Sequence, residues 1–336
     1  MNALYPWQKK DWQALLRERE RLPHALLLTG PAGIGKLRFA ERLAQWLLCE
    51  NPAGNEPCGE CEGCRWFAAG NHPDYRLLSP AEAEEDEDGK TKNKQPVIKV
   101  DAIRELEDFV NLTSHRRGVR VTVVAPAETM NVAAANAFLK TLEEPPAGAV
   151  FILVAHHWRR LLPTIRSRCR QFPLSQPDRH LASSWLEEHK VVNPQLHLAH
   201  SGGAPLAALD DASAEWLPKR HELLEHLANP AALDVIAVAQ GLEKSKLDVE
   251  LVVDWLQKWG HDLVSLGLGG TIRYYPDWKD DLQRLSVRAV ALLDWQKTLL
   301  SARKSAHHPL NARLVYETLL FAYLDALRNK RSESRA

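Results

Sequence analysis

The chain has 336 residues, of which 45% are hydrophobic, and its 43 lysines and arginines balance its 43 aspartates and glutamates. This length is typical of two or three domains, and the balanced charge gives no global sign of a nucleic-acid or membrane partner. No apolar run reaches the roughly 18 residues of a membrane span, and the N-terminus lacks the pattern of a signal peptide, so we expect a cytoplasmic protein.

The first predicted motif is a buried strand at 25–29 that leads into a glycine-rich loop and a helix. The loop fits the pattern G-x-x-x-x-G-K, in which glycines let backbone N–H groups converge on phosphate oxygens and the lysine neutralises terminal phosphates. The residues predicted to contact phosphate are Gly30, Gly33, Gly35 and Lys36. The next residue is normally Ser or Thr, which helps to hold Mg²⁺, but here it is Leu37. The loop therefore indicates a nucleotide-binding scaffold adapted to another use.

A cysteine cluster follows this helix. Its members are Cys49, Cys58, Cys61 and Cys64, the last three at C-x2-C-x2-C spacing. In a reducing compartment such spacing favours a metal site over disulfides. Four thiolates suit tetrahedral Zn²⁺ in a closed, structural site. Incidental small residues and iron–sulfur ligation are the alternatives, and no other feature supports the latter. We predict a structural zinc knuckle over residues 49–64.

Strands and helices alternate up to about residue 175. Further strands are expected near 75–78, at 120–124 and 149–155, and at 171–174. Asn131 is the predicted N-cap of a helix that runs to Glu144, where two prolines end it. The acidic stretch 81–96 cannot bury apolar surface and is predicted to be a mobile, solvated loop. The alternation predicts a mainly parallel sheet with helices on both faces.

Two polar positions bear on nucleotide chemistry. An ATPase of this architecture needs an acidic pair after its second core strand, but Ala125-Pro126-Ala127 stands there. Glu128 lies one or two residues after the position expected for these acids, and only a shifted register would place it in their role. Hydrolysis by this chain alone is therefore not expected. Farther on, Arg168 lies in a basic segment at 164–170 that is either a solvated turn or the source of an arginine finger for a neighbouring subunit.

After residue 177 the strand signal fades and helical patterns dominate. We predict three domains and a tail: a nucleotide-binding-like domain over 1–175, a helical lid over 176–210, a helical oligomerisation domain over 211–330, and a tail over 331–336.

Taken together, these motifs resemble the clamp-loader branch of the AAA+ ATPases. The resemblance rests on Gly30 to Lys36, the four-cysteine knuckle, His72-Pro73-Asp74-Tyr75, residues 100–104, residues 133–146 and Ser167-Arg168-Cys169. The Asn-Ala-x-Leu-Lys-x-Leu-Glu-Glu-Pro-Pro run and the Ser-Arg-Cys triplet are specific to this group. The resemblance is strong up to about residue 210 and is compositional beyond it.

The resemblance implies an α/β AAA+ sheet domain with a zinc knuckle, followed by a small helical lid domain and an all-α collar domain. ATP-binding loader subunits keep the acidic pair, so its loss implies a subunit without ATPase activity and with weak or absent ATP binding. Leu206 stands where the lid would carry a sensor arginine. Arg168 is implied to act in trans at the ATP site of the adjacent motor subunit.

The implied partners are ATPase motor subunits and a clamp-opening subunit in a pentameric ring, and through them the sliding clamp and primer-template DNA. The ring would serve the DNA-directed DNA polymerase III holoenzyme, whose nucleotidyltransferase chemistry belongs to another subunit. Two alternatives remain: an active motor subunit that relies on Glu128, and a zinc-dependent DNA-binding module. The acidic neighbours of the cysteines, Glu56, Glu60 and Glu62, count against phosphate contact there and so against the latter. Direct DNA contact through Arg116, Arg117 and Arg120 is a further hypothesis.

Overall fold

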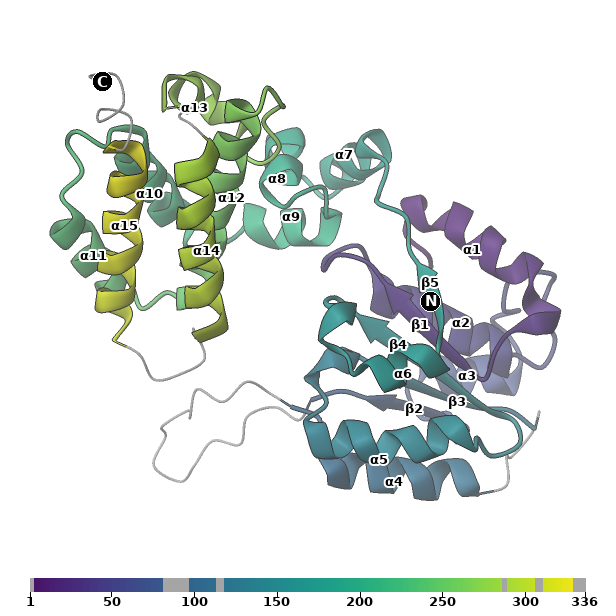
Figure 1. The fold of residues 1–336 in the computed structure, drawn as a ribbon. Coiled ribbons are helices and arrows are strands. Elements are labelled where there is room, and N and C mark those ends of the chain that lie inside the picture. Colours follow the sequence, from purple (N-terminus) through teal and green to yellow (C-terminus); the bar gives the residue numbers. More distant parts are fainter. Residues whose placement is uncertain (1–2, 81–96, 113–117, 286–288, 306–310, 329–336) are drawn as a thin grey trace. The chain divides into compact units, whose positions relative to one another are not determined.

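The computed structural model describes residues 3–80, 97–112, 118–285, 289–305 and 311–328 (Figure 1). The predicted acidic loop at 81–96, Arg116, Arg117 and the tail lie outside these ranges. The chain divides into two compact units. We call Met1–Trp185 with Ala204–Leu206 the sheet unit, and Leu186–Gly203 with Ala207–Ala336 the helical unit. No helix within the described ranges is long and apolar enough to cross a bilayer.

The sheet unit is built on a parallel sheet, as predicted. Five described strands pair in the order β2-β3-β4-β1-β5, and every pairing is parallel. The strands are β1 (Ala25–Thr29), β2 (Tyr75–Leu78), β3 (Arg120–Val124), β4 (Ala149–Ala155) and β5 (Arg170–Pro173). All residues of β1 and β3 are buried. Continuous apolar runs are expected where helices cover both faces of a parallel sheet.

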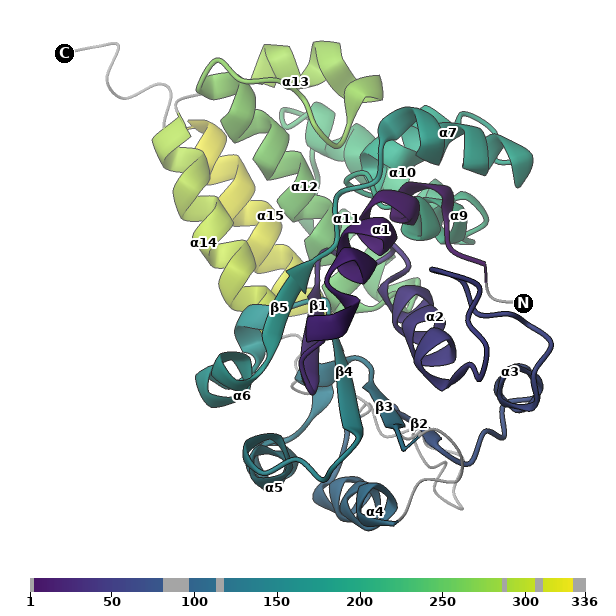
Figure 2. The same cartoon turned by 90° about the vertical axis from the view of Figure 1, so that its right-hand side faces the viewer.

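Helices cover the two faces as Figure 2 shows, with α2 on one side and α4, α5 and α6 on the other. The helices of this unit are α1 (Lys9–Arg17), α2 (Lys36–Leu48), α3 (Glu62–Ala68), α4 (Val100–Asn111), α5 (Val132–Glu143), α6 (Pro163–Arg168) and most of α7 (Arg179–Glu188). The Asn131 side chain caps α5, because its Oδ1 accepts a hydrogen bond from the Ala134 N–H at 2.7 Å. The predicted start of this helix is thus confirmed.

The helical unit is stabilised by aromatic side chains buried between its longer helices. Trp255, Trp259 and Trp295 are each at most 2% exposed. Two of their indole N–H groups form hydrogen bonds: Trp295 donates to the Leu319 carbonyl and Trp259 to the Tyr323 hydroxyl. The helices are α8 (Pro194–His200), α9 (Pro205–Ala212, which begins in the sheet unit), α10 (Leu217–Ala228), α11 (Val235–Lys244), α12 (Val249–Gly267), α13 (Lys279–Leu285), α14 (Ala289–Ser305) and α15 (Ala312–Arg328).

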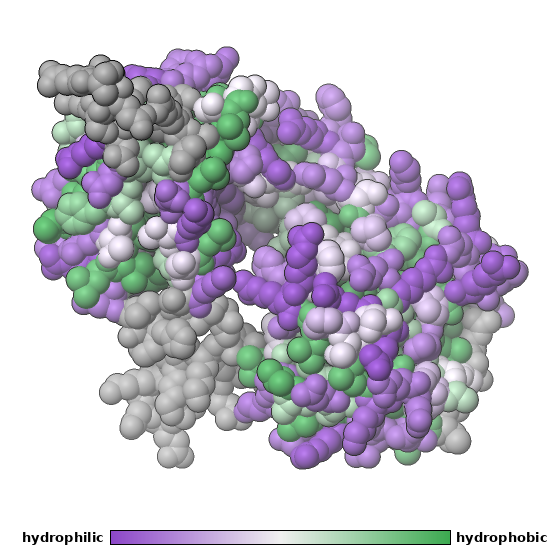
Figure 3. All heavy atoms as spheres, viewed as in Figure 1, coloured by the Kyte–Doolittle hydropathy of each residue, from purple (hydrophilic) through white to green (hydrophobic). Residues whose placement is uncertain are grey.

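Two surface features of the helical unit stand out. Large apolar side chains are exposed on α14 and α15, namely Leu293, Leu300, Leu314 and Phe321, and Figure 3 shows hydrophobic surface over these helices.

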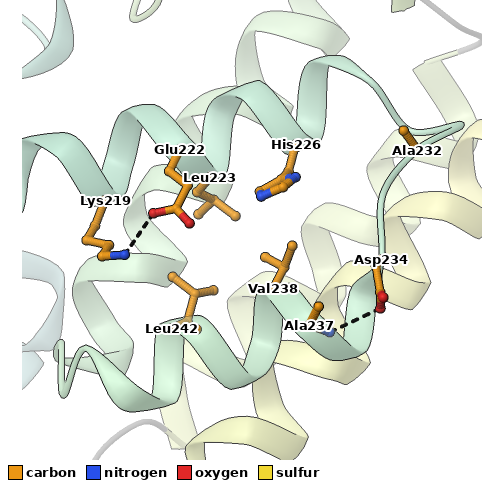
Figure 4. A pocket seen from close by; sticks show the side chains of 10 residues that line it. Lys219, Glu222, Leu223, His226, Ala232, Asp234, Ala237, Val238 and Leu242 are labelled. Carbon is orange, nitrogen blue, oxygen red and sulfur yellow. Dashed lines mark hydrogen bonds and ion pairs between the residues drawn. The ribbon is translucent and has the colours of Figure 1, made fainter.

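Between α10 and α11 lies a cavity of about 210 Å³ lined by Leu223, Val238 and Leu242, among others (Figure 4). It is smaller than the roughly 300–1,000 Å³ of sites for small molecules, so we assign no cofactor to it.

Candidate functional site

The predicted phosphate loop connects the end of β1 to the first residue of α2, as the motif requires. Gly35 is the N-cap of α2 and has a φ of +85°, in the left-handed region that favours glycine. A Cβ added there would lie 2.5 Å from Cδ2 of Tyr5. Both the backbone conformation and the close aromatic ring therefore require glycine at this position.

Lys36 is turned into its own loop. Its ammonium donates hydrogen bonds to the carbonyl oxygens of Gly30, at 2.7 Å, and Pro31, at 2.5 Å. The residue is 2% exposed. Burial lowers the pKa of Lys36 to about 8, against the opposing effect of the nearby Glu128 charge. The group predicted to meet terminal phosphates thus already has two protein partners.

The N-terminal segment supports this loop from outside, a role that the sequence analysis missed. The Trp7 indole donates to the Ile34 carbonyl at 3.0 Å, and the Gln8 amide donates to the carbonyls of Ile34 and Gly35. The Tyr5 and Trp7 rings stack with centroids 4.9 Å apart. The aromatic residues near the N-terminus indicate a buried segment, but the sequence does not indicate which part of the chain they contact.

Glu128 lies in the region after β3 where an ATPase of this architecture would carry an acidic pair. It lies in a short 3₁₀ turn (Ala127–Thr129) after β3. Its Oε1 accepts hydrogen bonds from the backbone N–H groups of His156 and His157, both at 2.8 Å. The carboxylate therefore links this turn to the end of β4. His156 is held neutral, because burial and the Lys36 charge lower its pKa to about 4.

The four predicted metal ligands lie together where α2 ends and α3 begins. Their sulfur atoms all lie within 4.8 Å of one another, and none forms a disulfide. The Sγ–Sγ distances are 3.5 Å for Cys49–Cys58, 3.9 Å for Cys58–Cys64 and 4.0 Å for Cys49–Cys61. A tetrahedral Zn²⁺ with Zn–S bonds of about 2.3 Å separates its sulfurs by about 3.8 Å.

Backbone N–H groups also point at these sulfurs. Cys58 N–H lies 3.2 Å from the Cys49 sulfur, and Cys61 N–H and Cys64 N–H each lie 3.4 Å from the sulfur three residues earlier. Hydrogen bonds from the Cys61 and Glu60 backbones lower the pKa of the Cys58 thiol to about 6, which favours the thiolate that binds metal. The cluster can hold a metal ion such as zinc.

Arg168 ends α6, and both ends of its guanidinium have a partner. Nη1 donates to the Thr164 carbonyl at 3.0 Å, and Nη2 forms an ion pair with Oε1 of Glu143. The next residue, Cys169, is buried in the core on the α5 side of the sheet, where burial raises the pKa of its thiol to about 12. Cys169 thus anchors the chain, and the Arg168 side chain remains 32% exposed.

The loop and Arg168 are not brought together. In the parallel register Arg170 is opposite Leu26, at the start of β1, and Pro173 is opposite Thr29, at its end. The loop follows Thr29, whereas Arg168 precedes Arg170. They consequently lie at opposite ends of these two strands, separated by the length of β1.

One predicted DNA contact is wrong. Arg120 is 4% exposed, and its guanidinium lies 3.6 Å from the Asp74 carboxylate and donates to the Phe109 carbonyl. Its partner Asp74 belongs to the His72-Pro73-Asp74-Tyr75 motif and directly precedes β2. Buried charges are normally paired in this way, so Arg120 is a core residue.

The parallel sheet and the glycine-rich loop between β1 and α2 define a P-loop α/β protein. A profile of the family described as "DNA polymerase III, delta subunit" matches residues 7–178. The chain is 36% identical to DNA polymerase III subunit delta′ of Pseudomonas aeruginosa, and the match covers 95% of this chain and 97% of the relative. It is 38% identical to the delta′ subunit of Escherichia coli over 229 residues, 67% of this chain and 65% of the relative.

The chain therefore belongs to the DNA polymerase III delta′ subunit family. It is also 34% identical to DNA polymerase III subunit tau of Salmonella typhimurium over 180 residues, 54% of this chain and 25% of that relative.

Proposed function

We propose that this chain is a subunit of the DNA polymerase III clamp loader that does not hydrolyse ATP and supplies Arg168 in trans to the ATP site of a neighbouring subunit. The loader places the sliding clamp on primed DNA. Polymerase chemistry belongs to another subunit of the holoenzyme. The observation that carries the proposal is the separation of Arg168 from the chain's own phosphate loop.

The register of β1 and β5 supports action in trans. An arginine that stabilises the transferred phosphoryl group must reach the terminal phosphate directly. Because Arg168 precedes β5, at the ends of the strands opposite the loop, it lies about the length of a strand away from any nucleotide held by Lys36. An exposed arginine at such an edge is placed to enter the site of an adjacent subunit. Fingers of this kind contribute about 10³–10⁵ in rate.

Four features of the loop region support the absence of turnover. Leu37 replaces the hydroxyl that holds Mg²⁺, and Ala125 follows β3 where an acid would stand. Glu128 uses one carboxylate oxygen to bind two backbone N–H groups. Lys36 already gives two of its three N–H donors to loop carbonyls and is 2% exposed, so little of its ammonium is left for a phosphate. We infer that ATP binding is weak or absent.

The cysteine cluster is proposed to bind structural Zn²⁺. Cys49 follows the last residue of α2, and Cys61 is the N-cap of α3, so a bound ion would fix the turn between these helices. A site closed by four cysteines leaves no position for a substrate. Zinc would therefore stabilise the sheet unit and take no part in phosphoryl transfer.

The helical unit is proposed to contribute the collar that joins this chain to the motor subunits and the clamp-opening subunit. Leu293 and Leu300 on α14, and Leu314 and Phe321 on α15, are each seven residues apart and 47–58% exposed. Residues seven apart lie on one face of a helix, so each helix presents an apolar stripe. We retain the predicted boundaries of sheet, lid and collar domains near residues 175 and 210 as part of this proposal.

The test is ATP hydrolysis with Mg²⁺, by the purified chain alone and by the loader assembled with its motor subunits and primed DNA. We expect no turnover by the chain alone, and a large loss in the loader that carries Arg168→Ala. Arg160→Ala, at another exposed arginine of the sheet unit, is the control. Unchanged turnover with Arg168→Ala would overturn the finger assignment. Turnover by the chain alone that needs Lys36 or Glu128 would make it a motor subunit.

A further inference from the structure

The ends of two helices meet at Arg168. Helix α5 ends at Glu143 and α6 ends at Arg168, and the two side chains form an ion pair between Oε1 and Nη2. On the other side, Nη1 donates to the Thr164 carbonyl, one turn back in α6, at 3.0 Å. The guanidinium is therefore held at both of its terminal nitrogens, by groups from two different elements.

We propose that Glu143 is a positioning residue for Arg168: it fixes the guanidinium before the neighbouring subunit presents its nucleotide. This inference rests on the proposed function of Arg168. A long arginine side chain loses much rotamer freedom when it binds phosphate. A partner within the same chain removes part of that freedom in advance, so less is lost when the transition state forms.

The two contacts leave Arg168 able to bind phosphate. A guanidinium has five N–H donors and no acceptor. One carboxylate oxygen and one carbonyl oxygen take a single donor each. The remaining donors can bind phosphate oxygens while the contact with Glu143 persists. Glu143 thus orients the group without blocking it.

The location of Glu143 is unfavourable for the helix itself. The C-terminal end of a helix carries partial negative charge, and acidic residues in the last turn are disfavoured there. Helix α5 nevertheless ends in Glu143, and Glu144 and two prolines follow. The positive charge of Arg168 compensates for Glu143. An acid that stands where helix electrostatics oppose it, paired with Arg168, is consistent with a role beyond the stability of α5.

The flanking arginines have different partners, so the contact is selective for Arg168. The guanidinium of Arg166 lies over the Trp158 ring, 5.2 Å from its centroid. Arg170 forms an ion pair with Glu18. Of the three arginines in this segment, Arg168 is the one tied to the end of α5.

The test uses the assembled loader with Glu143→Ala, Glu143→Gln or Arg168→Ala, and measures kcat and KM of DNA-stimulated ATP hydrolysis. Misplacement of a catalytic group by 1 Å can cost about 100-fold in rate, and we expect Glu143→Ala to lower kcat about tenfold with KM unchanged. Glu143→Gln should recover most of the loss, because its amide oxygen still accepts a hydrogen bond. Glu144→Ala, at the exposed neighbouring acid, is the matched control and should behave as wild type.

The double variant Glu143→Ala/Arg168→Ala separates positioning from other effects. If Glu143 acts through Arg168, the double variant should match Arg168→Ala alone. Losses that multiply, or a Glu143→Ala loader with wild-type kcat beside an impaired Arg168→Ala loader, would overturn this inference and leave the finger assignment intact. Wild-type turnover of Arg168→Ala itself would overturn both. Glu143 is 48% exposed, so we expect normal folding. If the alanine variant does not assemble, Glu143→Ser, which also removes the carboxylate, takes its place with the same expected loss of kcat.

Discussion

Leu26 of β1 stands opposite Arg170 of β5, and this register fixes where the two charged groups of interest lie. The loop that leads to Lys36 follows the carboxyl end of β1, whereas Arg168 precedes the amino end of β5. A parallel sheet keeps these ends apart. The same strand pair therefore separates the chain's own nucleotide loop from the arginine that we assign to a neighbouring site.

The first prediction concerns the shape of the Arg168 side chain. Arg168→Lys keeps the positive charge but lacks the planar fork that binds two phosphate oxygens at once. We expect the ATPase activity of the Arg168→Lys loader to be less than about three times that of the Arg168→Ala loader, and so far below that of wild type. Steady-state hydrolysis by loaders with wild type, lysine or alanine at 168 measures this. Full recovery with lysine would mean that charge alone, and not a phosphate contact, matters.

The second prediction concerns Lys36. Its ammonium binds the Gly30 and Pro31 carbonyls, so it should contribute nothing to hydrolysis. We expect Lys36→Ala to change loader turnover by less than about twofold, which is under 0.5 kcal/mol in activation free energy. The corresponding lysine of a motor subunit is the positive control, because its loss should strongly reduce turnover. A tenfold loss with Lys36→Ala in a normally assembled loader would show that this loop does bind nucleotide productively.

The third prediction separates two demands on glycine. Gly54 and Gly35 both have positive φ, +63° and +85°, but a Cβ at Gly54 would meet nothing within 4 Å. Gly54→Ala should lower the free energy of unfolding by about 1–2 kcal/mol, the left-handed penalty for an L-residue. Gly35→Ala should lose more, because its methyl group would also clash with Tyr5. Equal midpoints of thermal unfolding for the two variants would contradict the proposed packing of Tyr5 on the loop.

The fourth prediction concerns the cysteine cluster. Metal binding to a site that forms only in the folded chain stabilises the fold. Chelation, or Cys58→Ser, should lower the stability of the sheet unit by at least about 2 kcal/mol, or roughly 4–8 °C in Tm for a domain of this size. Glu60→Gln, at an exposed residue in the same loop, is the control. Metal analysis must accompany the melts, and unchanged unfolding after confirmed loss of zinc would exclude a structural role.

Local patterns in the sequence account for much of this architecture. The apolar runs at 25–29, 120–124 and 149–155 give the central strands, and Asn131 caps its helix through a bond to Ala134, three residues away. The cysteines come together as predicted because they span a short segment. In each of these cases the information lies within one element or one turn.

The contacts that were missed join residues far apart in the chain. Arg120 looked like a surface charge because its partner, Asp74, lies on the segment that leads into another strand. Glu143 and Arg168 belong to different helices, and their meeting depends on how α5 and α6 pack. Gln8 and Trp7 support a loop that is more than 20 residues away. A single sequence carries no periodicity or spacing from which such pairs can be read.

The last prediction concerns a histidine at the centre of the helical unit. His200 Nδ1 lies 2.7 Å from Nη2 of Arg220, and His200 Nε2 lies 3.1 Å from Oδ1 of Asp277. Because an arginine can only donate, Nδ1 must accept, and the neutral ring donates from Nε2 to Asp277. Burial lowers the pKa of His200, and so does the charge of Arg220, while Asp277 opposes them.

A histidine whose pKa is lower in the folded state than in the unfolded state binds fewer protons when folded. The free energy of unfolding must then fall as the pH drops below about 6.5, the unfolded value, toward the folded pKa. Protonation would also place a second cation against Arg220 and remove the acceptor at Nδ1. We therefore expect the helical unit to lose stability between pH 7 and pH 5.

Urea unfolding at several pH values, with wild type and His200→Gln, tests this dependence. Glutamine cannot gain a proton in this range, so its stability should vary less with pH than that of wild type. His221→Gln is the matched control, because the His221 side chain is 64% exposed and pairs with Glu225 on the surface of α10. His197, whose pKa is also lowered, should preserve part of the slope in every variant. If wild type and His200→Gln lose stability equally on acidification, His200 does not titrate as its contacts with Arg220 and Asp277 require.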